Sequence, residues 1–219
     1  MKKRTIIISL TALIIVSGVF LSFTYLNADT ELKDDPTVKK ADNEEKHSCC
    51  SSEDAEEFSE SSIYQLESEW LTQDGNKFEL EELTGKPVVL TMFFASCTYA
   101  CPILVNDMKK IEASLSEKEL QKYQFVLVSI DPERDTPEAL KKFAAAKELD
   151  LKRWTLLTGS SDDVLELAAL TGFKYKKEPD GSYSHSNMIM ILNEQGEIAH
   201  QHLGLNQDLT AALTLIKNL

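Results

Sequence analysis

Cys97, Cys101 and His185 are the residues of this chain whose types and spacing suggest chemistry. The two cysteines follow an apolar run and are separated by three residues. Pro102 stands where helices commonly begin, so the second thiol should lie at a helix N-terminus, where the helix dipole and unpaired N–H groups favour the thiolate. The sequence therefore predicts two reactive, partly exposed sulfurs, which can bind a metal or close into a disulfide.

The elements that must position these residues follow the order of a thioredoxin-like fold, which is an α/β fold. Strand, helix, strand and helix are followed by a hairpin and a closing helix, with an added N-terminal β-hairpin and an inserted strand-helix unit. Asp74-Gly75 marks the turn of the N-terminal hairpin. The expected elements are hairpin arms at 70–72 and 77–80, strands at 88–94, 125–130, 154–157, 188–192 and 197–202, and helices at 102–116, 137–148, 161–170 and 209–217, the third capped by Ser161 or Asp162.

The pairing of two strands should bring His185 to the thiols. In a thioredoxin fold the strand at 188–192 pairs antiparallel with the strand at 88–94, and an antiparallel strand begins at the edge where its partner ends. The loop at 182–186 should therefore approach the two sulfurs. Two soft thiolates and one imidazole suit copper, especially Cu(I), at low coordination number, whereas zinc normally takes four donors in a closed site. We predict a copper site formed by these three side chains.

Four further residues with metal-binding side chains receive other interpretations. Met188 and Met190 alternate along a predicted strand, which favours packing in the core over a role as thioether ligands. His200 and His202 fall on one face of the last predicted strand, and we interpret them as surface residues.

Three separated motifs resemble the Sco (SenC) family. The first is Phe-Phe-Ala-Ser-Cys-Thr-Tyr-Ala-Cys-Pro at 93–102, the second is Ser-Ile-Asp-Pro-Glu-Arg-Asp-Thr-Pro at 129–137, and the third is His185 ahead of an apolar strand. The resemblance spans about residues 63–219, and three motifs in register are more specific than any one of them.

The resemblance implies that Cys97, Cys101 and His185 bind copper, as Cu(I), Cu(II) or both. It also implies assembly of the binuclear copper site in cytochrome c oxidase subunit II, or service to a similar copper protein. We therefore expect a copper metallochaperone and not an enzyme, although the same two thiols could support thiol-disulfide reductase activity.

The chain departs from the family pattern directly after the first cysteine. The family usually has proline there, and this chain has Thr98. The change affects the stiffness of the loop but removes no donor atom. Asp131 and Asp135 match the family's acidic motif, and we interpret them first as turn and helix-cap residues.

Two other functions fit the same residues. A membrane-anchored thiol-disulfide oxidoreductase acting on the cysteines of a copper-site protein needs only the cysteine pair. Typical redox thioredoxins have two residues between their cysteines, whereas this chain has three. A copper or redox sensor module is the third hypothesis, and the sequence does not separate it from a chaperone.

The first residues indicate membrane attachment. Lys2, Lys3 and Arg4 precede an uncharged, mostly apolar run from Thr5 to Ala28. The apolar region of a cleaved signal has about 7–15 residues and a spanning helix needs about 20, so a transmembrane anchor at 1–28 is favoured over a cleaved export signal. The positive-inside rule then places the rest of the chain outside the cytoplasm, on the periplasmic side of the cell membrane.

An acidic segment at 29–62 separates this anchor from the predicted domain at 63–219. It carries twelve acidic residues against four basic ones, so we expect a flexible tether. His47, Cys49 and Cys50 within it could form an auxiliary metal-acquisition motif, take part in intermolecular disulfides, or be ordinary flexible sequence. The formal net charge of -13 argues against a nucleic-acid ligand, because contact with phosphates needs clustered Lys and Arg.

Overall fold

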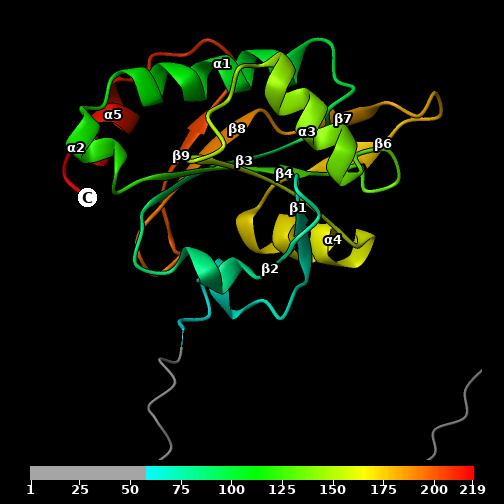
Figure 1. Ribbon diagram of the computed structural model, residues 1–219, viewed down its shortest axis with the longest axis horizontal. Coiled ribbons are helices and arrows are strands. Elements are labelled where there is room, and N and C mark those ends of the chain that lie inside the picture. Colours follow the sequence, from blue (N-terminus) through cyan, green and yellow to red (C-terminus); the bar gives the residue numbers. More distant parts are fainter. Residues whose placement is uncertain (1–57) are drawn as a thin grey trace, which may run out of the picture. The chain divides into compact units, whose positions relative to one another are not determined.

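Residues 58–219 are described by a computed structural model, which shows a seven-stranded sheet with helices on both of its faces (Figure 1). The strands are β1 (Trp70–Thr72), β2 (Lys77–Phe78), β3 (Val88–Phe93), β4 (Gln124–Ser129), β5 (Trp154–Gly159), β6 (Tyr175–Lys177), β7 (Tyr183–His185), β8 (Met188–Leu192) and β9 (Ile198–Leu203). The helices are α1 (Ala100–Ala113), α2 (Glu117–Leu120), α3 (Pro137–Ala146), α4 (Ser161–Thr171) and α5 (Thr210–Ile216), with short 3-10 helices at Ile63–Gln65 and Leu80–Leu83.

The strand order of the main sheet is β2-β1-β5-β4-β3-β8-β9, and β6 and β7 form a separate two-stranded sheet. β3, β4 and β5 are parallel neighbours, and β8 pairs antiparallel with β3. α1 and α3 cover one face of the main sheet, and α4 covers the other (Figure 1). The predicted order of strands and helices is observed, and the predicted pairing of 188–192 with 88–94 is confirmed.

The central strands consist mostly of apolar residues, as expected for strands whose two faces are both covered by helices. All six residues of β3 and all five of β8 are buried, as continuous apolar runs predict for strands between two layers. Phe125 of β4 stacks on Trp154 of β5 with ring centroids 4.9 Å apart. This core fixes the edge of the sheet where β3 ends and β8 begins.

The predicted N-terminal hairpin and inserted strand-helix unit both extend the sheet beyond β4. β5 and α4 lie between α3 and β8 in the chain, and β1 pairs antiparallel with both β2 and β5. Trp70 of β1 is fully buried, and a Cβ at Gly159 of β5 would come within 2.7 Å of its ring. Glycine at this position therefore allows the indole of the added hairpin to approach β5.

The start of α4 differs from the prediction by one position. Ser160 caps the helix, instead of Ser161 or Asp162. Its hydroxyl accepts from the N–H of Asp163, and the carboxylate of Asp163 accepts from the N–H of Ser160. This reciprocal capping box satisfies two N–H groups at once, so it fixes where the helix begins.

The loop predicted at 182–186 is instead part of a short hairpin. β6 and β7 have three residues each and pair antiparallel, with Tyr175 opposite His185. All six residues are exposed or half-buried. The hairpin therefore lacks the apolar alternation by which a strand is recognised in a sequence.

The predicted anchor at 1–28 lies outside the described residues, and so do His47, Cys49 and Cys50. None of the helices within residues 58–219 combines the length and the hydrophobicity that a membrane span requires. The division of the chain after residues 28 and 62 therefore stays a prediction.

Candidate metal centre

The two cysteines lie where β3 passes into α1. Cys97 belongs to the connecting segment at 94–99, the cysteine loop, and its N–H donates to the carbonyl of Phe94 at 3.1 Å. α1 begins at Ala100 and not at Pro102, so Cys101 is the second residue of the helix. The N–H of Cys101 donates to Cys97 Sγ at 3.3 Å, which holds the first sulfur at the start of the helix.

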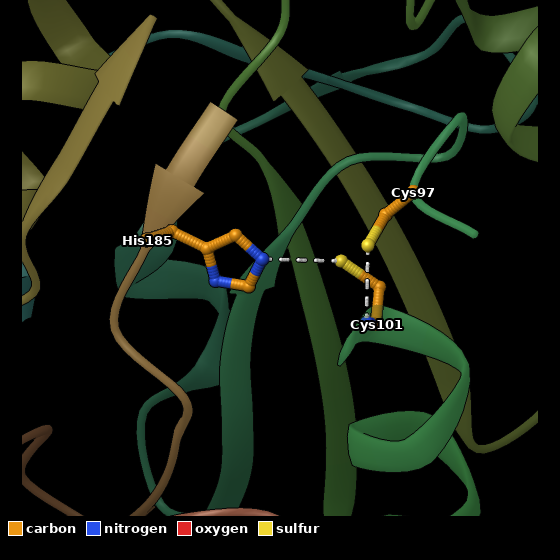
Figure 2. A group of neighbouring side chains, drawn as sticks. All are labelled: Cys97, Cys101 and His185. Carbon is orange, nitrogen blue, oxygen red and sulfur yellow. Dashed lines mark hydrogen bonds between the residues drawn. The ribbon is translucent and has the colours of Figure 1, made fainter. Parts of the chain in front are cut away.

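His185 is the last residue of β7, and its ring faces the two sulfurs (Figure 2). Its Nε2 lies 3.6 Å from Cys101 Sγ. Its Nδ1 lies 2.8 Å from the carbonyl oxygen of Ser186, and because a carbonyl only accepts, Nδ1 is the donor there; in the neutral imidazole this leaves the lone pair on Nε2, as a metal ligand needs. The donor atoms of Cys97, Cys101 and His185 all lie within 4.8 Å of one another, so the structure brings the three predicted residues together.

Two phenylalanines hold the plane of the imidazole. Phe173 stacks on His185, with ring centroids 5.9 Å apart and planes inclined by 15°. Phe94 meets the imidazole edge-on at 5.7 Å. Phe94 belongs to the first sequence motif, whereas no pattern in the sequence indicates Phe173, because it follows α4 and reaches the site only through the tertiary fold.

The prediction of two reactive, partly exposed sulfurs is wrong for Cys101. This side chain has no exposed surface and belongs to the core. Burial is the main cause that raises the pKa of its thiol, and the negative charges of Cys97 and Asp135 add to the change. The physical reason is that Cys101 lies inside α1, at helical spacing from the buried Leu104 and Met108, and so shares the face that packs on the core.

Cys97 has the opposite environment. Its side chain is half-buried, and this burial alone would raise the pKa of the thiol. The N–H groups of Cys101, Tyr99 and Ala100 stabilise the thiolate, however, and the net effect is a pKa below the ordinary value for cysteine. Cys97 is therefore the accessible, nucleophilic thiol of the pair.

This asymmetry predicts the order of alkylation in the reduced full-length chain at pH 7. Iodoacetamide should modify Cys97 several-fold faster than Cys101, because the thiolate is the reacting form. The rate at Cys97 should level off at a lower pH in the native chain than in urea, since its pKa is lowered only by the fold. Timed labelling followed by peptide mass spectrometry measures both rates. The denatured chain is the control, in which the two rates should converge; equal rates in the native chain would contradict the assignment.

The acidic motif lies beside the cysteine loop. Asp131 closes the turn after β4, as predicted. Asp135 is not a helix cap, because Thr136 caps α3. Asp135 is buried instead, and its carboxylate accepts from the N–H of Ala95 at 2.9 Å and from the hydroxyl of Ser129 at 2.6 Å. Burial raises its pKa, and these hydrogen bonds oppose the change. Asp135 therefore ties the cysteine loop to the end of β4.

The remaining candidates do not join the site. Met188 and Met190 are buried in the core, which confirms the packing interpretation. The prediction that His202 is a surface residue is wrong, because α5 packs on β9 and leaves the side chain 6% exposed. Burial lowers the pKa of its imidazole. His200 is half-buried.

Comparison with known proteins gives one family for the described residues. The SCO1/SenC family model matches residues 58–218. The SCO1 protein homolog of Bacillus subtilis is 31% identical over 136 residues, which cover 61% of this chain and 70% of that protein. The residues that the family model matches include the cysteine loop, the acidic motif and His185.

Two solved structures have a similar fold. BsSco, described as having a disulfide switch and as a member of the Sco family of cytochrome c oxidase assembly proteins, is 26% identical with a TM-score of 0.57, covering 68% of this chain and 89% of that one. Yeast Sco1, solved with copper bound, is 22% identical with a TM-score of 0.59, covering 69% of this chain and 84% of that one. At the identity of the yeast protein, the likeness shows the fold alone.

Proposed function

We propose, from the premise that this chain belongs to the SCO1/SenC family, that Cys97, Cys101 and His185 hold copper for delivery to another protein. The observation that carries the proposal is the convergence of two thiols and one imidazole, whose donor atoms lie within 4.8 Å of one another. The lone pair of His185 Nε2 already faces the sulfurs, so binding asks for little rearrangement of the imidazole.

The donor set fits copper. Soft thiolates with an imidazole favour Cu(I), and imidazole also suits Cu(II). Among the described residues, the converging group consists of two cysteines and one histidine, whereas a structural zinc site normally has four protein ligands. Cys101 would bind from the side of the core, while the half-buried Cys97 and His185 keep the site within reach of a partner.

The proposed client is cytochrome c oxidase subunit II or a similar copper protein. Support comes from the family and from BsSco, which is described as a member of a family of oxidase assembly proteins. The reduced full-length chain, loaded with copper, would be mixed with copper-free subunit II, and the copper in each protein would be measured by mass spectrometry after separation. We expect one copper per chain before mixing and transfer to the subunit afterwards. Copper that stays on the chain would argue against delivery.

A second candidate function is the reduction of a disulfide in a copper-site protein, which the unequal cysteines favour. The Cys97 thiolate would attack one sulfur of the client disulfide, forming a mixed disulfide and releasing the other sulfur as a thiolate. The Cys101 thiol would then lose its proton and attack Cys97 Sγ, which releases the second client thiolate and leaves a Cys97–Cys101 disulfide. Two electrons pass to the client, and an external dithiol reductant would restore the pair.

We also propose that residues 1–28 anchor the chain in the cell membrane, with the tether at 29–62 and the domain at 63–219 on the periplasmic side. The positive charges ahead of the apolar run support this orientation. On cell fractionation the intact chain should stay with the membranes, and protease added to spheroplasts should remove the domain. Recovery of a soluble mature chain that starts near Asp29 would contradict the anchor.

A further inference from the structure

The hairpin that carries His185 is fastened to the turn at 131–134. Arg134 Nη2 donates to the carbonyl of Gly181, at the tip of the hairpin, at 2.6 Å. The guanidinium also lies over the ring of Tyr183, two residues before His185, with its Cζ 5.9 Å from the ring centroid. One side chain therefore contacts both the tip and the second strand of the hairpin.

Arg134 is in turn held by Asp131. The side chain of Asp131 has no exposed surface, and its carboxylate forms an ion pair with Arg134 Nε. A buried carboxylate needs such a partner, because an unpaired buried charge is strongly destabilising. The hydroxyl of Tyr183 also donates to Asp131, at 3.4 Å. Asp131 and Arg134 thus contact the hairpin as a unit.

Few other contacts hold the outer part of the hairpin. β6 and β7 form their own two-stranded sheet, and such a hairpin is at best marginally stable by itself. At its base, the N–H of Ser186 donates to the carbonyl of Lys174. Farther out, Lys177 pairs with Glu133 at 2.6 Å, but exposed ion pairs contribute little because solvent screens them. Tyr183 packs on Phe94 with ring centroids 5.4 Å apart, but it is Arg134 that holds the tip of the hairpin, at Gly181.

The same turn also holds the cysteines. Asp135, the neighbour of Arg134, accepts from the N–H of Ala95 at the start of the cysteine loop. The segment at 131–135 therefore contacts the cysteine loop through one side chain and the histidine hairpin through another. This segment therefore links the loop that carries the two cysteines to the hairpin that carries His185.

We propose that Arg134 is a positioning residue, which keeps His185 beside Cys101 by latching the β6–β7 hairpin to the turn at 131–134. The inference rests on the proposed copper site but not on the identity of the client. Without the latch, the hairpin would hold the imidazole less firmly beside the sulfurs, and the third donor would be in place for a smaller fraction of the time.

A double-mutant cycle on the reduced full-length chain tests the latch through its affinity for Cu(I). Arg134→Ala should weaken binding about 10-fold, the lower end of the range for residues that orient a metal ligand. In the His185→Ala background the same change should have no further effect, because no imidazole is left to position. Lys176→Ala is the matched control, because it also removes a cation from the hairpin. The partner of Lys176 is Glu178, which belongs to the hairpin itself and not to the turn at 131–134. The affinity for Cu(I) should therefore not change.

The outcomes separate the latch from the copper site itself. If Arg134→Ala binds copper as the unchanged chain does while His185→Ala binds more weakly, the latch is wrong and the site stands. If His185→Ala binds as tightly as the unchanged chain, the proposed site itself fails. An equal loss from Arg134→Ala in both backgrounds would also overturn the latch, because the effect would not pass through His185.

Hydrogen exchange of the copper-free chain gives a second readout that does not depend on binding. Arg134→Ala should speed exchange of the backbone amides at 175–186 and leave that of α4 unchanged, because the change loosens one local unit. Uniform acceleration would indicate general destabilisation and overturn the proposal. If Arg134→Ala does not fold, Arg134→Lys replaces it in both experiments, since an ammonium keeps the charge beside Asp131 but lacks the fork that also reaches Gly181.

Discussion

A chain that carries Cys97→Ala or Cys101→Ala is expected to lose tight copper binding. Each change removes one of the three converging donors and leaves one sulfur and one imidazole. Removing only an outer partner of a metal ligand lowers affinity about 10–100-fold, so loss of a thiolate, the soft donor that Cu(I) prefers, should lower it more than about 100-fold. Competition with a chromogenic Cu(I) chelator, on the reduced full-length chain, measures the change.

The two substitutions should differ in their effects on the fold. Cys101 belongs to the core, whereas Cys97 is half-buried, so only Cys101→Ala should lower the free energy of unfolding, by about 1 kcal/mol. The chain with Cys49→Ser and Cys50→Ser is the control for thiols outside the site and should keep tight binding. Unchanged copper affinity in either the Cys97 or the Cys101 variant would refute the assigned ligands.

His185→Ala is expected to separate copper delivery from disulfide chemistry. A disulfide reductant needs only the cysteine pair, whereas a three-donor copper site needs the imidazole. The variant should bind copper at least about 10-fold more weakly and assemble the oxidase poorly in cells. It should still form and reduce the Cys97–Cys101 disulfide. Copper competition and thiol titration on one preparation measure both properties.

Cells that carry Cys97→Ser provide the comparison for His185→Ala. If assembly survives in His185→Ala cells but fails in Cys97→Ser cells, copper ligation is not the essential function and disulfide reduction replaces it. If both fail and added copper partly rescues only the His185 variant, delivery is supported, because mass action can offset a weakened site but cannot replace a missing thiol.

The meeting of the three donors could be predicted because it follows from strong, simple patterns. The apolar runs at 88–93 and 188–192 are long enough to be strands, and their antiparallel pairing brings the residues that follow β3 to those that precede β8. That geometry brings the chain ahead of β8, and His185 with it, to the side of the sheet where the cysteine loop lies. The positions of the donors therefore depend on strand pairing, which hydrophobic patterns specify well.

The burial of Cys101 could not be predicted from the same patterns. Pro102 suits the first turn of a helix, but it does not say which residue begins that turn. Here α1 begins at Ala100, so Cys101 lies within the first helical turn. It is three residues before Leu104 and seven before Met108, and helical periodicity therefore puts it on the face that these residues bury in the core.

The contacts of Arg134 were equally hidden from sequence reasoning. Its partner Gly181 is 47 residues away, in a polar hairpin with no apolar alternation. A hydrogen bond from a side chain to a backbone carbonyl also cannot be recognised from composition or periodicity. Only the folded arrangement places the acidic motif between the two halves of the donor set.

Cys101 and His185 are 84 residues apart in the chain. Copper binding by all three donors would therefore depend on completed tertiary structure. The cysteine pair is local and exists in any partly folded chain, whereas the third donor arrives only when β8 has paired with β3. At free copper about 100 times the dissociation constant, binding would favour the native state by about 2.7 kcal/mol. Copper held by all three donors would then mark chains in which this part of the tertiary structure is complete.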